Sequence, residues 1–258
     1  MGVYLTLLLG LLVAGADAVK APPMISREKG SVTATGKDGV VRWTADWTME
    51  PWKERGERAV RFTERGRGRY TPFQQDVQWS LEAVWTAENT FSPVRVEKTF
   101  TDASGHTLAT EKKTFDKDMS SARFETTQKD GASQTKSIPV TPGTLVIEGI
   151  AGVLRFLPFD RWQPFTTRLI TNDGQVYRMK LELRGKERIT TPAGAFECYK
   201  VEFVPELGVL NVLRSFAPKA YFWFTVSPPH FWVRYEGPET GASSPKIVME
   251  LKTYEVEH

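Results

Sequence analysis

Residues 77–85 read VQWSLEAVW, a run in which apolar and polar side chains alternate. Its apolar members are Val77, Trp79, Leu81, Ala83 and Trp85, and they alternate with Gln78, Ser80 and Glu82. Because successive side chains of a β-strand point to opposite faces of a sheet, this period of two predicts a strand with one face on a core and the other in water. Antiparallel sheets are the usual setting for such strands.

The same period recurs in later segments, and turn sequences separate the apolar runs. Residues 177–184 (YRMKLELR) and 247–252 (IVMELK) alternate in the same way. Short sequences rich in Gly, Asp, Asn or Pro lie between the runs, at residues 36–39, 102–105, 129–131, 172–174 and 192–194. Such turns suit hairpins. The chain is therefore predicted to form a meander, in which each strand pairs with its neighbour in sequence.

One segment is apolar on both faces. Residues 221–224 read YFWF, and a strand of this kind must be covered on both sides. A strongly curved or partly closed sheet, with a helix on its concave side, provides that cover. A β-sandwich corner provides it equally well.

A single convincing helix is predicted, beginning at Thr141 and ending before Pro158. Thr141 is a suitable N-cap, Pro142 fits the first helical position, and apolar residues follow at helical spacing. Its expected length is about 12 to 15 residues. Residues 206–216 are a candidate for a second, short helix. The predicted fold class is mainly β: a curved, partly closed antiparallel meander sheet with one short helix covering the concave face.

The composition excludes several classes of protein and site. Of 258 residues, 25% are charged and 40% are hydrophobic, a globular balance that excludes disordered and collagen-like chains. One cysteine and three histidines leave neither an internal disulfide nor a Cys- or His-cluster metal site, so we expect no metal and no cofactor. The net charge of +3 is too small to predict nucleic-acid binding. No catalytic motif occurs, and we expect a protein that is not an enzyme and has no catalytic residues.

The N-terminus predicts export. Residues 3–14 are almost wholly apolar, and Ala16-Asp17-Ala18 supplies the small-x-small pattern of a signal-peptidase site. The apolar run is about a dozen residues, shorter than the roughly 18–20 that span a bilayer. We predict a signal peptide over residues 1–18, one β-rich domain over 19–258 without a transmembrane span, and a periplasmic or secreted location. A retained membrane anchor is the alternative. The unpaired Cys198 is then expected to be buried.

Large apolar side chains at core-facing positions suggest a ligand site. The candidate residues come from the predicted strands and helix: Trp79, Trp85, Leu154, Tyr177, Met179 and Trp223. A concave face lined by them is expected to hold a lipid or another apolar ligand, provided that the helix leaves space. A packed core without a ligand is the alternative.

The chief anomaly of charge is a run of six arginines between residues 55 and 69, with only Glu57 and Glu64 beside them. The members proposed to form a strip that docks an anionic partner are Arg61, Arg65, Arg67 and Arg69. Such a strip suits anionic lipid headgroups or a polyanionic envelope polysaccharide. A solvated strand pair without a partner is the alternative.

Residues 188–201 read RITTPAGAFECYKV, which is similar to the element T-P-A-G-x-F-x-x-Y-x-V of the bacterial exported family called domain of unknown function 3108. Residues 220–224, Pro228-Pro229 and residues 233–236 resemble the same family's W-[FL]-[ST]…P-V-R segment, and Phe231-Trp232 departs from it. The resemblance covers roughly residues 93–255. It implies an exported, β-rich envelope protein with a curved sheet and without established catalytic residues.

Three hypotheses of function follow. The leading one is an uncharacterised exported envelope protein that binds an apolar or amphipathic, lipid-like ligand without catalysis. The alternative is an assembly or scaffold protein that docks an anionic partner through the arginine strip. The third, a hydrolase that acts on envelope polymers, requires two carboxylates that converge in a cleft.

Overall fold

The computed structural model describes residues 17–73, 75–206 and 218–257. Within these ranges the first half of the chain forms eight strands, β1 Arg27–Gly36, β2 Val41–Glu54, β3 Glu57–Arg69, β4 Asp76–Ala87, β5 Phe91–Thr101, β6 Thr107–Phe115, β7 Ser121–Gln128 and β8 Ser133–Pro139. The second half forms β9 Leu145–Val146, α1 Ile150–Leu154, the 3-10 helix η1 Phe159–Arg161, β10 Phe165–Ile170, β11 Val176–Thr191, β12 Gly194–Pro205, β13 Ala220–Thr225, β14 Trp232–Pro238 and β15 Lys246–Glu257.

All fifteen of these strands belong to one sheet, whose order is β8-β7-β6-β5-β4-β3-β2-β1-β15-β14-β13-β12-β11-β10-β9. Two meanders, β1–β8 and β10–β15, are joined because the first strand pairs with the last, antiparallel, from Arg27 opposite Glu257 to Gly36 opposite Ile247. The two-residue β9 is parallel to β10. The predicted meander is confirmed, and each of the five turn sequences joins a pair of adjacent antiparallel strands.

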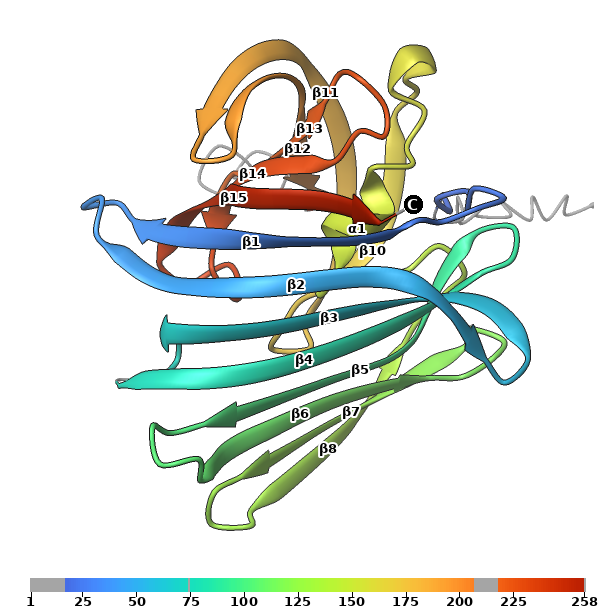
Figure 1. The fold of residues 1–258 in the computed structure, drawn as a ribbon. Coiled ribbons are helices and arrows are strands. Elements are labelled where there is room, and N and C mark those ends of the chain that lie inside the picture. Colours follow the sequence, from blue (N-terminus) through green and yellow to red (C-terminus); the bar gives the residue numbers. More distant parts are fainter. Residues whose placement is uncertain (1–16, 74, 207–217, 258) are drawn as a thin grey trace, which may run out of the picture.

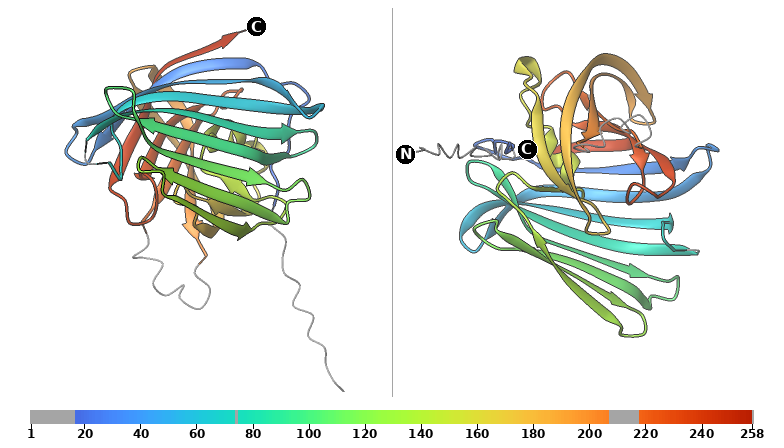
Figure 2. Two further views of the ribbon diagram at one scale, coloured as in Figure 1. Left: turned by 90° about the horizontal axis from the view of Figure 1, so that it is seen from below. Right: turned by 180° about the vertical axis from the view of Figure 1, so that it is seen from behind.

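The sheet is strongly curved, so that the inner faces of the two meanders look toward each other (Figures 1 and 2). One large hydrophobic core, to which strands of both meanders contribute, fills the space between them. The helix α1 lies on this concave side, where Gly152 meets Met49 of β2. The prediction of a mainly β, curved meander sheet with a short helix on the concave face is confirmed.

The helix is shorter than the sequence predicted. It has five residues, Ile150–Leu154, and begins after Gly149, whose φ of 71° is a left-handed conformation that favours glycine. Upstream, Leu145 and Val146 pair with β10 instead of continuing a helix from Thr141. Pairing of buried apolar residues with the sheet therefore overrides their helical spacing. Of the second predicted helix, residues 207–216 lie outside the described residues.

The doubly apolar strand β13 is covered on both faces, as its sequence requires. Phe222 and Phe224 join the main core, whereas Trp223 belongs to a second cluster on the opposite face. The other buried members of that cluster are Ile189, Cys198 and Val233. The cover comes from the long β11–β12 hairpin, which curls at the top of Figure 1 and shifts its register between Leu183 and Lys186. Cys198 is fully buried, as predicted.

The segment before β1 packs against the body of the protein. Val19 is 1% exposed, and its carbonyl accepts a hydrogen bond of 2.8 Å from the backbone N–H of Phe91. Asp17 exchanges two hydrogen bonds with the backbone of Thr166. Across the described ranges, no helix has the length and apolar character needed to cross a membrane.

Candidate ligand-binding site

A cavity of about 330 Å³ lies between the two meanders. Its wall consists of inner-face residues of β1–β5 and β10–β15, of residues in the loops beside these strands, and of residues 147–152 and Arg155 from around α1. The volume lies within the roughly 300–1,000 Å³ of known small-molecule sites. The concave face of the sheet is therefore only partly filled by side chains.

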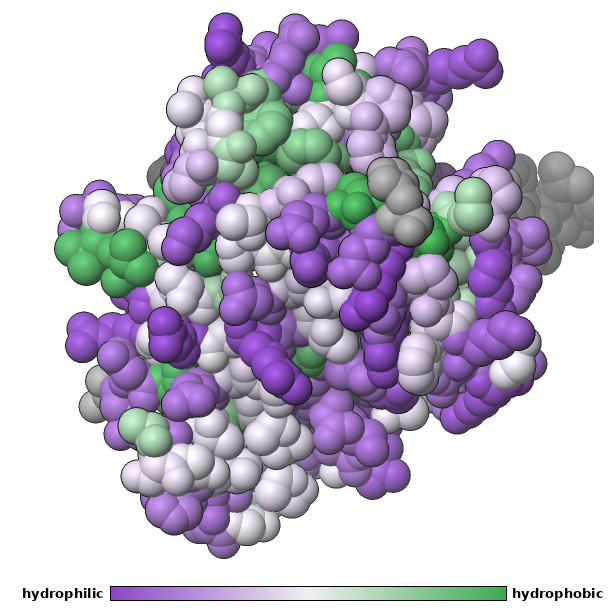
Figure 3. Space-filling view, viewed as in Figure 1, coloured by the Kyte–Doolittle hydropathy of each residue, from purple (hydrophilic) through white to green (hydrophobic). Residues whose placement is uncertain are grey.

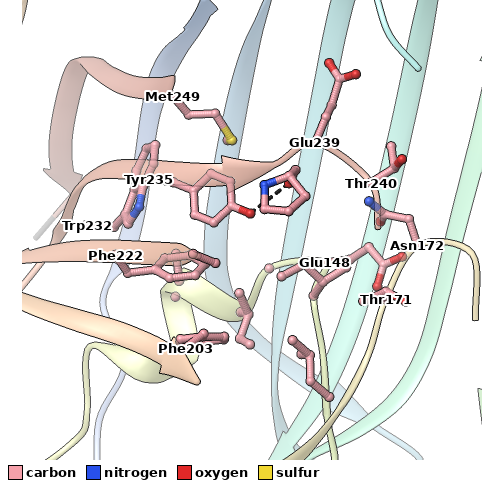
Figure 4. Close-up of a pocket in the computed structure, with 18 of the residues that line it drawn as sticks. Glu148, Thr171, Asn172, Phe203, Phe222, Trp232, Tyr235, Glu239, Thr240 and Met249 are labelled. Atoms are coloured by element: carbon pink, nitrogen blue, oxygen red, sulfur yellow. Dashed lines mark hydrogen bonds between the residues drawn. The ribbon is translucent and has the colours of Figure 1, made fainter. Parts of the chain in front are cut away.

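The two sides of the cavity differ in chemistry (Figure 4). On one side of that view lie apolar and aromatic side chains: Phe203, Phe222, Trp232, Tyr235 and Met249. On the other side lie polar ones: Glu148, Thr171, Asn172, Glu239 and Thr240. We call these the apolar end and the polar end. A molecule that matches both must itself be amphipathic.

A buried lysine lies near the polar end. Lys98 of β5 is 4% exposed, and its ammonium donates a hydrogen bond of 2.8 Å to the hydroxyl of Tyr70. The same ammonium lies 4.1 Å from the centre of the Tyr70 ring and 4.9 Å from that of Phe100. The side-chain amide of Asn172 donates to the Tyr70 hydroxyl as well, at 3.3 Å. Burial raises the pKa of Tyr70 well above its ordinary value, so the hydroxyl stays protonated.

Four carboxylates line the cavity, and each has a partner from another element. The indole N–H of Trp79 donates to Glu64 at 2.7 Å. Glu239 accepts from the indole of Trp43 at 2.7 Å and from the backbone N–H of Thr71 at 3.0 Å, and the Arg42 guanidinium lies 3.6 Å away. The remaining two form buried ion pairs, Glu28 with Arg155 and Glu148 with Lys113. Burial raises the pKa of Glu64, although the charge of Lys98 opposes this effect.

One carboxylate oxygen in the wall has no partner. Oε1 of Glu148 accepts from Lys113, whereas Oε2 is buried without a hydrogen bond within the described ranges. The indole N–H of Trp232, at the apolar end, is likewise buried and unpaired. Native proteins leave few buried polar atoms unsatisfied, so these two atoms are candidates for hydrogen bonds to a ligand.

The structure brings only part of the predicted ligand-binding set to the cavity. Tyr177 and Met179 line it. Three other candidates, Trp79, Trp85 and Leu154, are buried in the main core and are not part of the cavity wall. Trp223 lies on the opposite face of β13, where its indole donates to Glu187.

Several residues of the cavity wall were not among those predicted from the sequence. Trp43, Trp47 and Met49 alternate along β2, so the period of two carried a usable signal for them. Glu148 and Lys98 had no such signal, because their partners come from strands distant in sequence. No group of three or more metal-binding side chains that could hold an ion was found in the described part of the chain.

The predicted arginine strip lies on the outer face of β3, but its members differ. Arg61 is half-buried, stacks 3.9 Å above the ring of Trp52, and forms ion pairs with Glu50 and Glu82. The other three, Arg65, Arg67 and Arg69, are exposed and have no ion pair among the residues that the structure describes. Figure 3 shows hydrophilic side chains over much of this face of the molecule.

Comparison with known proteins identifies relatives of the chain. A family model described as "Protein of unknown function (DUF3108)" matches residues 31–243. Two crystal structures are similar, each with a TM-score of 0.36 and each aligned over 93% of this chain and 100% of its own. One is described as a "putative exported protein with YmcC-like fold" from Bacteroides fragilis, at 10% identity, and the other as a "putative lipoprotein" from Parabacteroides distasonis, at 11% identity. A search of curated proteins found no match.

Proposed function

We propose that this chain, which belongs to the family described as Protein of unknown function (DUF3108), is an exported envelope protein. We further propose that it binds an amphipathic, lipid-like ligand without catalysing a reaction. The observation that supports this proposal is the cavity, with its apolar end and its polar end. Lipid chains suit the first and a headgroup suits the second.

The chemistry of the cavity favours binding over catalysis. Its carboxylates are engaged by tryptophan, lysine and arginine side chains or by backbone N–H groups. Such partners hold a carboxylate in place, so it stabilises the wall and is poorly suited to transfer a proton to or from a substrate. The raised pKa of the Tyr70 hydroxyl likewise makes it a poor base at neutral pH.

Export is proposed from the N-terminal sequence. Residues 3–14 are apolar, and Ala16-Asp17-Ala18 suits cleavage by signal peptidase. Cleavage there leaves Val19, which packs into the body, at the new N-terminus. Expression in a bacterial host, followed by fractionation and N-terminal sequencing, tests this proposal. A periplasmic or secreted product that begins at Val19 is expected, and a cytoplasmic product that retains Met1 would contradict it.

The binding proposal is tested by mass spectrometry of the natively purified protein. We expect a co-purifying amphipathic molecule that organic solvent releases. The variant Met249→Trp narrows the cavity, because Met249 lines it and points into it in Figure 4. The neighbouring residue Val248 is outside the cavity wall, so Val248→Trp serves as the matched control.

The expected result is a co-purifying ligand in the wild type and in Val248→Trp, and its loss from folded Met249→Trp. Circular dichroism and thermal melting establish that each variant folds. Two outcomes count against the proposal: no ligand in the wild type, either co-purified or bound on addition of lipids, or equal occupancy in both variants.

A scaffold role is the second candidate, and it is favoured by the three exposed arginines of β3 that form no ion pair with any described residue. Triple reversal of Arg65, Arg67 and Arg69 to Glu is expected to abolish sedimentation with anionic phospholipid vesicles at low salt. The matched control reverses three exposed cations elsewhere, Lys112, Lys129 and Arg188, and should retain binding. Equal vesicle binding by the two variants would exclude the strip as the docking surface.

A further inference from the structure

One buried acceptor at the polar end has no donor among the described residues. It is Oε2 of Glu148, which is buried and receives no hydrogen bond from the part of the chain that the structure describes, and the whole residue is only 5% exposed. The side-chain amide of Asn172 donates an N–H to the Tyr70 hydroxyl, and its oxygen can only accept a hydrogen bond. A ligand that satisfies these atoms must bring O–H or N–H donors, since two acceptors do not bond to each other.

The charges around the cavity are already balanced. Glu28 is paired with Arg155, Glu148 with Lys113, and Glu239 with Arg42. The fourth carboxylate, Glu64, interacts with the charge of Lys98, whose ammonium is also engaged by the Tyr70 hydroxyl. Lys98 forms no ion pair within the described ranges, but its charge offsets that of Glu64. The four lining carboxylates are thus matched by four cations (Arg155, Lys113, Arg42 and Lys98), and a charged headgroup would add a charge without a counterpart.

A charged headgroup is therefore disfavoured at this site. Burying an ion without an opposite charge costs far more than burying a neutral polar group that makes hydrogen bonds. A phosphate at the polar end would also approach the free oxygen of Glu148, and two acceptors of negative charge repel each other. Neutral hydroxyl groups avoid both costs and supply the missing donors.

We infer that the ligand is an amphipathic molecule with an uncharged, hydroxyl-bearing head, which donates hydrogen bonds to Glu148 and Asn172 while its hydrocarbon part contacts the apolar end. This inference rests on the proposed binding function and specifies the class of ligand. An acylglycerol or another neutral lipid with free hydroxyl groups has the required chemistry. A phospholipid with an anionic head does not.

Three probes with the same twelve-carbon chain test the inference on the delipidated protein, each below its micelle concentration. They are 1-lauroylglycerol, which is neutral and has two hydroxyl groups, dodecyl phosphate, which is anionic, and dodecyltrimethylammonium, which is cationic and has no donor. Calorimetry or native mass spectrometry gives the three dissociation constants. We expect 1-lauroylglycerol to bind at least about tenfold tighter than either charged probe, the difference that corresponds to 1.4 kcal/mol.

A variant that adds a positive charge to the polar end also tests the inference. Thr240 lines the polar end, so Thr240→Arg adds an unpaired cation there and should shift the preference toward dodecyl phosphate. Ser243 lies in the same β14–β15 loop but is exposed and outside the cavity wall, so Ser243→Arg should leave the preference unchanged.

The outcomes separate the inference from the function on which it rests. Equal or tighter binding of a charged probe by the wild type overturns the inference and leaves the binding function intact. Failure of all three probes and of longer-chain lipids to bind the folded wild type overturns the binding function, and the inference with it. The wild-type series distinguishes these outcomes even where a variant does not fold.

Discussion

At the scale of single residues, buried charges connect elements that are distant in sequence. Arg155 follows α1, and its partner Glu28 lies in β1, 127 residues away. Lys113 of β6 reaches Glu148, which precedes α1. Removal of one partner from such a pair leaves the other charged in a medium of low polarity, which is strongly destabilising. These ion pairs therefore tie the segment around α1 to the first meander.

Replacement of Lys113 by Met tests how much the ion pair with Glu148 contributes to the free energy of unfolding. The side chains of Lys113 and Glu148 are 2% and 3% exposed, so the variant should lose about 3–5 kcal/mol of unfolding free energy in urea denaturation. The double variant Lys113→Met/Glu148→Leu removes both charges and should recover most of the loss. Lys117→Met breaks the exposed pair with Glu57 and should cost at most about 1 kcal/mol. Equal losses in Lys113→Met and Lys117→Met would refute the prediction.

The thiol of Cys198 should be inert in the folded protein. Burial, with smaller contributions from Glu187 and Glu197, raises its pKa to about 12, and the thiolate is the reactive form. We expect no reaction with an aromatic disulfide reagent at pH 8 before unfolding, and one reactive thiol per chain after unfolding in guanidinium. Cys198→Ser serves as the blank in both states. Rapid labelling of the native protein would contradict the buried position.

The raised pKa of Cys198 also predicts how the stability of the protein changes with pH. Because the pKa is higher in the folded state than in the unfolded state, the protonated thiol contributes its full stability below the unfolded pKa, and this contribution is lost as pH rises toward 12. Between pH 8 and pH 10.5, denaturation midpoints should fall more steeply for the wild type than for Cys198→Ser. Parallel curves would show that the shift is absent.

At the scale of elements, the strands were predictable and the segment around α1 was not. Alternation in residues 77–85 identified β4, and the turn sequences identified the hairpins, because both signals are local. The helix was overestimated since Leu145 and Val146 have helical spacing but pair with β10, a contact that no local pattern records. The cavity depends on the same non-local contacts, so most of its wall could not be predicted.

The β8 edge of the sheet should be less stable than its centre. The outermost strand β8 has one buried side chain, Ile138, and among the described strands it pairs only with β7. In hydrogen exchange, its amides should open by local fraying, whereas those of β1 and β15 at the centre exchange through larger unfolding. Mass spectrometry of peptic peptides checks this order. Equal protection of residues 133–139 and 247–251 would be inconsistent with the observed sheet order.

At the scale of the whole molecule, the pairing of β1 with β15 makes one sheet out of two meanders. Along this junction, Ser31 and Thr253 share a side-chain hydrogen bond across 222 residues of sequence. Without it, both strands would present unpaired edges, which promote aggregation. The junction also holds the cavity walls opposite each other, because β1 and β15 both contribute lining residues.

A circular permutant tests this view of the architecture. A Gly/Ser linker joins the end of β15 to Val19, and new termini open in the β7–β8 turn at residues 129–131, far from the junction in the strand order. The permutant should keep the circular dichroism spectrum and the monodisperse elution of the parent. A chain that lacks residues 246–257 should aggregate. Soluble, cooperative folding of that truncated chain would show that the junction is dispensable.

The β1–β15 junction also forms late in biosynthesis, because its two strands lie near opposite ends of the sequence. A ribosome adds about 5–20 residues per second, so the 222 residues between Ser31 and Thr253 take on the order of 10–40 s to make. Hairpins of the first meander form within microseconds of leaving the exit tunnel, whereas the outer edge of β1 waits for a partner not yet translated. During that interval the nascent chain is the species that chaperones must protect.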